Sequence, residues 1–116
     1  MWQGDRPIYL QIRDLIVARI LDRAASDAAE PLSSVRALAT ELDVNPLTVA
    51  KAYQELQAAG LIVARKGVGL YVEAGAAKAL RESERAAFLK SEWPRLRRRV
   101  DRLGLTAEDL FAPEEA

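Results

Sequence analysis

The residues best suited to chemistry lie in one segment, DVNPLTVAKAYQELQAAG, which spans residues 43–60. Asn45 is the expected cap of a helix that begins at Pro46, because an asparagine side chain accepts a backbone N–H and proline fits the first helical turn. No acidic residue stands between Val44 and Gln54. The outward face of this helix is expected to consist of Leu47, Thr48, Ala50 and Lys51. Small, apolar and hydrogen-bonding side chains, free of acids that phosphates would repel, predict a surface that reads DNA.

Composition disfavours catalysis and metal binding. The chain has neither histidine nor cysteine, which removes the commonest metal ligand, the usual acid–base side chain near pH 7, and every disulfide. We therefore expect a cytoplasmic protein without a membrane segment, and no enzyme, cofactor or metal site. Residues 1–75 carry 8 basic and 9 acidic side chains, and residues 76–116 carry 9 and 8. This balance argues against nucleic-acid binding unless the charges are sorted onto opposite faces.

Hydrophobic spacing sets out the elements that must position these side chains. Apolar residues recur at helical intervals over residues 7–24, and Ser34 is placed to cap a second, short helix. Gly60 ends the third helix, and two strands, 61–65 and 70–72, follow it. The inward faces of the second and third helices are expected to consist of Val35, Leu38, Ala39, Leu42, Val49, Ala52, Tyr53 and Leu56. The predicted fold class is mainly α with a small β-hairpin, arranged as a winged helix-turn-helix.

Three stretches together resemble one protein family. PIYLQIRDLIVARI, LSSVRALATELDVNPLTVAKAYQELQAAGLI and RKGVGLYV cover about residues 7–73. They are similar to the DNA-binding domain of the GntR family of bacterial transcription regulators. The resemblance implies a winged helix-turn-helix DNA-binding domain over residues 7–75. The remainder, residues 76–116, resembles the YtrA subfamily, which implies a short helical dimerisation region.

The chain departs from the family pattern at three points. Leu32-Ser33-Ser34 lacks the usual central proline, which predicts a looser start to the second helix. The linker after the first helix has no glycine. The third helix exposes the neutral Leu47 and Ala50, whereas most members carry more than one basic residue there. These departures bear on which bases are read rather than on whether DNA is bound.

The resemblance assigns roles to individual residues, and each has a structural alternative. Arg36 becomes a phosphate or base contact, and otherwise is a solvated arginine. Asn45 is first of all a helix cap. From the chemistry of its side chain alone, Leu47 could touch a thymine methyl, or it is an ordinary exposed leucine. The loop that contains Gly67 contacts a minor groove or the phosphates, or is only a hairpin turn. The complete DNA-binding set is Ser34, Arg36, Asn45, Pro46, Leu47, Thr48, Lys51, Arg65, Lys66, Gly67 and Gly69.

The C-terminal region is predicted to be helical. The first helix of this region should kink or break at Pro94, and Gly104 should stop the next one. Thr106 and Asp109 predict a capping box for a last short helix.

Two side-chain classes stand out in this region. The run RLRRR at residues 95–99 is interpreted as a solvated helix face, partly paired with Glu92 and Asp101, rather than as a nucleic-acid patch. The large apolar side chains are too numerous for such short helices to bury. They predict a dimer interface formed by Phe88, Trp93, Leu96, Val100, Leu103, Leu110 and Phe111.

The functional hypothesis is a homodimeric, sequence-specific transcriptional repressor that binds a near-palindromic operator in double-stranded DNA. The YtrA resemblance extends it to operators of ABC-transporter genes. No small-molecule effector is indicated by these residues. The alternative hypothesis is a winged-helix module for protein–protein interaction, which the zero net charge favours.

Overall fold

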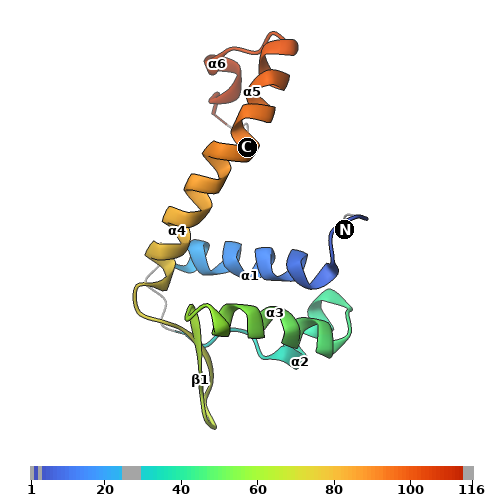
Figure 1. The fold of residues 1–116 in the computed structure, drawn as a ribbon, viewed down its shortest axis with the longest axis vertical. Helices are drawn as coiled ribbons and strands as arrows, with labels where there is room; N and C mark the ends of the chain where they lie inside the picture. Colours follow the sequence, from blue (N-terminus) through green and yellow to red (C-terminus); the bar gives the residue numbers. More distant parts are fainter. Residues whose placement is uncertain (1, 3, 25–29, 114–116) are drawn as a thin grey trace. The chain divides into compact units, whose positions relative to one another are not determined.

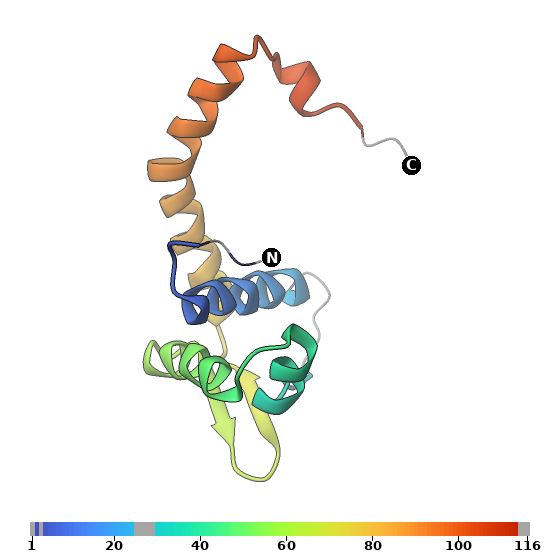
Figure 2. The same ribbon diagram turned by 90° about the vertical axis from the view of Figure 1, so that its right-hand side faces the viewer.

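The computed structural model describes residue 2 and residues 4–24 and 30–113. Three helices come first: α1 (Ile8–Ala24), α2 (Val35–Leu42) and α3 (Pro46–Ala58). Strands β1 (Ile62–Arg65) and β2 (Gly69–Val72) then form a two-stranded antiparallel sheet. Figures 1 and 2 both show α1 lying along one side of α3, while the β-hairpin extends away from the helices on the other side. The winged helix-turn-helix that the sequence predicts is confirmed, whereas the linker at residues 25–29 lies outside the described residues.

The predicted caps start both helices of the helix-turn-helix. The Ser34 hydroxyl accepts the backbone N–H of Ala37 at 3.0 Å at the start of α2. The Asn45 side-chain oxygen accepts the N–H of Leu47 at 2.8 Å at the start of α3. Between the helices, Asp43 adopts the left-handed conformation with φ 54°, which aspartate tolerates better than most residues. Local chemistry therefore fixes where each helix begins and where the chain turns.

The core lies between α1, α2 and α3, and β1 and one residue of α4 (Ala76–Ala87) close it. Val35, expected to face inward, is only half-buried at its edge. Valine, leucine and isoleucine side chains stabilise a fold by roughly 1.5–3 kcal/mol each when they are fully buried. The buried cluster consists of Ile12, Ile16, Val17, Ile20, Leu38, Ala39, Leu42, Val49, Ala52, Tyr53, Leu56, Ile62 and Leu80. Packing against this cluster holds α3 in a fixed orientation.

The surface of the first part of the chain adds one ion pair between helices. The guanidinium of Arg19 on α1 donates to both carboxylate oxygens of Glu41 on α2, one of them at 3.2 Å. The hydrogen bond from Arg19 lowers the pKa of Glu41. Both side chains are well exposed, so water screens the pair and its contribution to stability is small.

The β-hairpin is joined to the helices by backbone hydrogen bonds. Within it, Ile62 pairs with Val72 and Arg65 pairs with Gly69. The N–H of Leu32, ahead of α2, donates to the carbonyl of Leu70 on β2 at 2.7 Å. The start of α2 and the hairpin therefore form one connected substructure.

The chain divides into two compact units, Met1–Arg81 and Glu82–Ala116. The expected boundary after residue 75 stays a prediction. Helix α4 begins in the first unit, and in the second it leads into a π-helical segment, η1 (Phe88–Glu92), and then into α5 (Trp93–Arg102). Among the residues described above, no helix is long and apolar enough to cross a membrane.

The helix does not break at Pro94, which excludes one of the two outcomes expected there, a kink or a break. Helical structure continues through residues 76–102. The N–H of Trp93 donates to the carbonyl of Phe88, five residues back, which is the wider π-type turn. Pro94 follows that turn directly and occupies the first turn of α5, where a missing N–H costs little. The π-helical segment therefore accommodates the proline.

The last helix, α6 (Ala107–Leu110), begins with the predicted capping box. The N–H of Thr106 donates to the Asp109 carboxylate at 2.8 Å, and the N–H of Asp109 donates to the Thr106 hydroxyl at 3.3 Å. The hydrogen bonds from Thr106 lower the pKa of Asp109. Gly104, with φ 68°, ends α5 in the left-handed conformation as expected.

Candidate nucleic-acid interface

The segment before α2 is anchored at each residue from Leu32 to Ser34. Leu32 donates to β2, and the Ser34 hydroxyl caps α2. Between them, the carbonyl of Ser33 accepts the hydroxyl of Tyr53 on α3 at 2.6 Å. These hydrogen bonds therefore support the start of α2, although Ser33 stands where the family usually has a proline. This anchoring fixes the first turn of α2, which carries the exposed Arg36.

Tyr53 gives this anchor a pH dependence that can be measured. Burial raises the pKa of Tyr53 from 10.0 to about 12. The unfolded chain therefore loses the phenolic proton first, so the stability from this group is intact below pH 10 and is lost as the pH rises toward 12. Each pKa unit corresponds to about 1.4 kcal/mol. We expect Tyr53→Phe to lose about 1 kcal/mol near pH 7 and to show a smaller alkaline decline.

The measurement is urea unfolding at pH 8–11.5, with Tyr71→Phe as the matched control. The control removes a hydroxyl outside the core and should keep the alkaline decline. An identical pH profile in wild type and Tyr53→Phe would contradict the role given to Tyr53.

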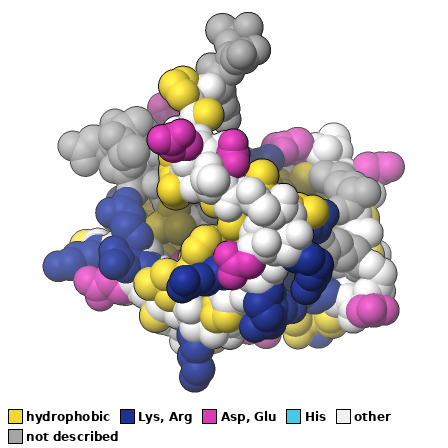
Figure 3. Space-filling view, turned by 90° about the horizontal axis from the view of Figure 1, so that it is seen from above, with side chains coloured by type: hydrophobic (Ala, Val, Ile, Leu, Met, Phe, Trp, Pro, Cys, Tyr) yellow, Lys and Arg dark blue, Asp and Glu magenta, His cyan; other side chains and the backbone are white. Residues whose placement is uncertain are grey.

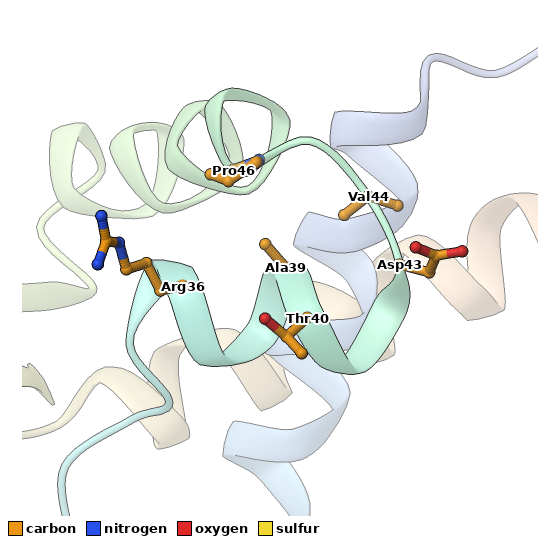
Figure 4. A pocket seen from close by; sticks show the side chains of 6 residues that line it. All are labelled: Arg36, Ala39, Thr40, Asp43, Val44 and Pro46. Atoms are coloured by element: carbon orange, nitrogen blue, oxygen red, sulfur yellow. The ribbon is translucent and has the colours of Figure 1, made fainter.

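An open hollow of about 510 Å³ lies between α2 and the start of α3. Figure 4 shows Arg36 and Asp43 at opposite ends of α2, with the Arg36 side chain extending toward α3. The hollow is lined by Arg36, Ala39, Thr40, Asp43, Val44 and Pro46. Arg36 thus lies at the positively polarised N-terminal end of α2, where an anion is favoured.

The exposed face of α3 differs from the prediction in two respects. Leu47 is 77% exposed, as expected for an outward position. Thr48 and Ala50, however, are only half-buried rather than fully exposed. Lys51 is exposed, but its Nζ lies 4.0 Å from the centre of the Tyr9 ring on α1. This cation–π contact directs the Lys51 ammonium toward α1, at the margin of the α3 face.

The hairpin loop carries the other basic candidates. Gly67 has φ 75° and Gly69 has φ 136°, conformations that side chains larger than glycine rarely adopt. Lys66 is exposed. The guanidinium of Arg65 lies 4.4 Å from the centre of the Tyr71 ring, which holds it against the sheet. Arg65 pairs with Gly69, and Tyr71 lies two residues beyond Gly69 on the same strand. Arg65 and Tyr71 are therefore diagonal neighbours on one face of the sheet.

Sequence reasoning missed three residues that shape this surface. Val68, at the tip of the hairpin, is 62% exposed between the two glycines. Tyr71 was detectable from strand register, because it is the diagonal neighbour of Arg65. Tyr9 gave no local signal, since its contact with Lys51 depends on how α1 packs against α3.

Charge is mixed outside this surface. Figure 3 shows basic and acidic side chains interspersed over one face of the molecule. In the second unit, the arginines of residues 95–99 are exposed, and within the described part of the chain no ion pair joins them to Glu92 or Asp101. The expected pairing of this run is therefore absent there, because neither carboxylate comes within 4.0 Å of an arginine nitrogen.

The predicted dimerisation residues are largely accessible in the second unit. Phe88 and Trp93 stack with their ring centres 6.4 Å apart. Phe111 is 84% exposed, and Trp93 and Val100 are half-buried. The remaining exposed apolar residues include Leu89, Leu96, Leu103, Leu105 and Leu110. Their role in self-association stays a prediction.

A helix-turn-helix followed by a two-stranded wing defines a class of DNA-binding regulators, the winged-helix proteins. Residues 8–72 match the family described as bacterial regulatory proteins, gntR family. The chain therefore belongs to the GntR family of transcription regulators, as its motifs indicated. Members of this family bind DNA and are not enzymes.

Relatives extend the similarity beyond the winged helix. The HTH-type transcriptional regulator YhcF of Bacillus subtilis is 31% identical over an alignment 118 residues long, which covers 95% of this chain and 88% of YhcF. The HTH-type transcriptional repressor YtrA of the same organism is 38% identical over 82 residues, 71% of this chain and 62% of YtrA. A GntR-family regulator from Listeria monocytogenes superimposes with a TM-score of 0.67 at 32% identity, covering 96% and 95% of the two chains. The chain is thus a YtrA-like GntR regulator.

Proposed function

We propose that the protein is a homodimeric repressor that binds a near-palindromic operator through α2, the start of α3 and the wing. The observation that supports the proposal is that the candidate contacts belong to the hydrogen-bonded elements of one compact unit. Arg36, the exposed residues of the first two turns of α3, which include no acid, and the glycine-containing wing all belong to the first unit. Hydrogen bonds connect the segments that support them. The positively polarised start of α2 adds a favourable site for a phosphate.

Repression and dimerisation rest on separate grounds. YtrA of Bacillus subtilis is described as a repressor, and its similarity supports the same sign of regulation here. The exposed apolar side chains of the second unit support self-association, and a two-fold dimer requires a near-palindromic site with half-sites about 10 bp apart. From the YtrA resemblance we extend the proposal to ABC-transporter genes and to action in the cytoplasm.

The test is selection of bound duplexes from a random-sequence library by the full-length protein, followed by affinity measurement. The proposal expects a near-palindromic sequence bound at least about a thousandfold more tightly than random duplex at physiological salt. A protein that enriches no sequence would instead favour the protein-interaction module that zero net charge suggests.

Arg36→Ala should weaken operator binding without affecting folding. Arg36 is exposed at the start of α2, so its loss leaves the core intact. Loss of one phosphate contact lowers the salt slope of log K by about 0.9, and loss of a guanine contact lowers affinity by about 1–3 kcal/mol. The measurement is fluorescence anisotropy with the selected duplex at several salt concentrations.

The matched control is Arg81→Ala, which removes an exposed arginine from α4. It should leave both affinity and salt slope near the wild-type values. An Arg36→Ala protein that binds as tightly as Arg81→Ala would remove α2 from the proposed interface.

A further inference from the structure

We propose that Leu47 reads the C5-methyl group of a thymine in each operator half-site, so that α3 recognises DNA by apolar contact. This inference rests on the proposed function and adds the chemistry of its readout. It concerns the first turn of α3, because residues near the start of a recognition helix are the ones that reach base edges in the major groove.

Leu47 is exposed at a position where no packing contact among the described residues accounts for a leucine. A single exposed leucine is common on protein surfaces. Leu47 is nevertheless 77% exposed at the second position of α3, on the face opposite the buried Val49, Leu56 and Tyr53. No fold requirement within the described residues accounts for a leucine there, since it belongs neither to the core cluster nor to the side chains packed against it.

The hydrogen-bonding side chains at the start of α3 are partly engaged or only partly exposed. The side-chain oxygen of Asn45 accepts the N–H of Leu47 itself at 2.8 Å, which leaves only its amide N–H groups. Thr48 is half-buried. Lys51 holds its ammonium over the Tyr9 ring. Gln54 is exposed, but it lies two helical turns, about 10 Å, further along α3.

The chemistry of the major groove then selects the partner. The C5-methyl of thymine is the apolar group that base pairs present there, and the other groups are hydrogen-bond donors and acceptors. A leucine that contacts this methyl removes apolar surface of both partners from water. Cytosine presents no methyl at that position, so the contact distinguishes the two pyrimidines. The loss of one methyl from such a contact corresponds to about a fourfold loss of affinity.

The experiment removes single methyl groups from DNA without altering base pairing. The probe is the duplex selected from the random library by full-length protein, resynthesised with deoxyuridine in place of each thymine in turn. Affinities are measured by fluorescence anisotropy for wild type, Leu47→Ala and the matched control Gln54→Ala. We expect wild type and Gln54→Ala to lose about fourfold at one thymine per half-site, and Leu47→Ala to bind both duplexes equally.

Two results would overturn the inference while leaving the proposed function standing. One is a wild-type protein that binds the selected duplex tightly but is insensitive to every deoxyuridine. The other is a Leu47→Ala protein, folded by circular dichroism, that keeps the wild-type sensitivity. Failure to select any duplex would instead reject the proposed function, and the inference with it.

Discussion

The double substitution Leu96→Glu/Leu103→Glu is expected to yield a folded monomer with operator affinity reduced by about a hundredfold or more. The two leucines lie seven residues apart, Leu96 on α5 and Leu103 at its C-terminal cap, and are 45% and 60% exposed. Glutamate at these exposed positions does not disturb the chain itself, but it would place four charges in a two-fold apolar interface. Loss of the dimer separates the two winged helices that bind the half-sites. The affinity gained by holding them together is then lost.

Sedimentation equilibrium and operator titration of the same samples test this expectation. Arg98→Glu is the matched control, because it introduces a negative charge on α5 away from the leucine side. That variant should remain dimeric. The prediction fails if wild type is monomeric at micromolar concentration, or if the double variant dissociates and still binds the operator with wild-type affinity.

The local signals in the sequence predicted most of the fold. Ser34, Asn45 and Thr106 cap their helices as expected, because a capping hydrogen bond involves only residues two or three apart. The buried face of α3 was also predicted, since a repeat of three and four residues marks one side of a helix. These features depend on neighbours in sequence, which is why they were visible without coordinates.

The errors come from features that depend on tertiary structure or on a rarer helix geometry. Periodicity gave no warning that a π-type turn at Phe88–Glu92 would accommodate Pro94. Thr48 and Ala50 were assigned to the exposed face by their positions, but both are half-buried. The contact of Lys51 with Tyr9 likewise required knowing how α1 lies against α3. The outward position of Leu47 was therefore predicted from sequence, while the burial and direction of the neighbouring side chains were not.

The two leucines of α3 should have separate effects when each is replaced by alanine. Leu56 is fully buried in the core formed by α1, α2 and α3, whereas Leu47 is exposed. Leu56→Ala removes buried methyl groups and leaves a cavity, at a cost of about 2–5 kcal/mol in the free energy of unfolding. That is a large fraction of the roughly 5–15 kcal/mol that stabilises a typical domain. Leu47→Ala should change stability by less than about 0.5 kcal/mol.

Operator affinity per folded molecule should show the opposite order. Leu56→Ala leaves every candidate DNA contact in place, so its folded fraction should bind like wild type, whereas Leu47→Ala should bind more weakly. Urea unfolding gives the stabilities, and anisotropy titration corrected for the folded fraction gives the affinities. Both substitutions shorten the same residue type on the same helix, so loss of side-chain volume or a change in helix propensity cannot explain a difference between them. If Leu47→Ala destabilised the fold as much as Leu56→Ala, α3 would be packed on both sides and would have no free face to offer DNA.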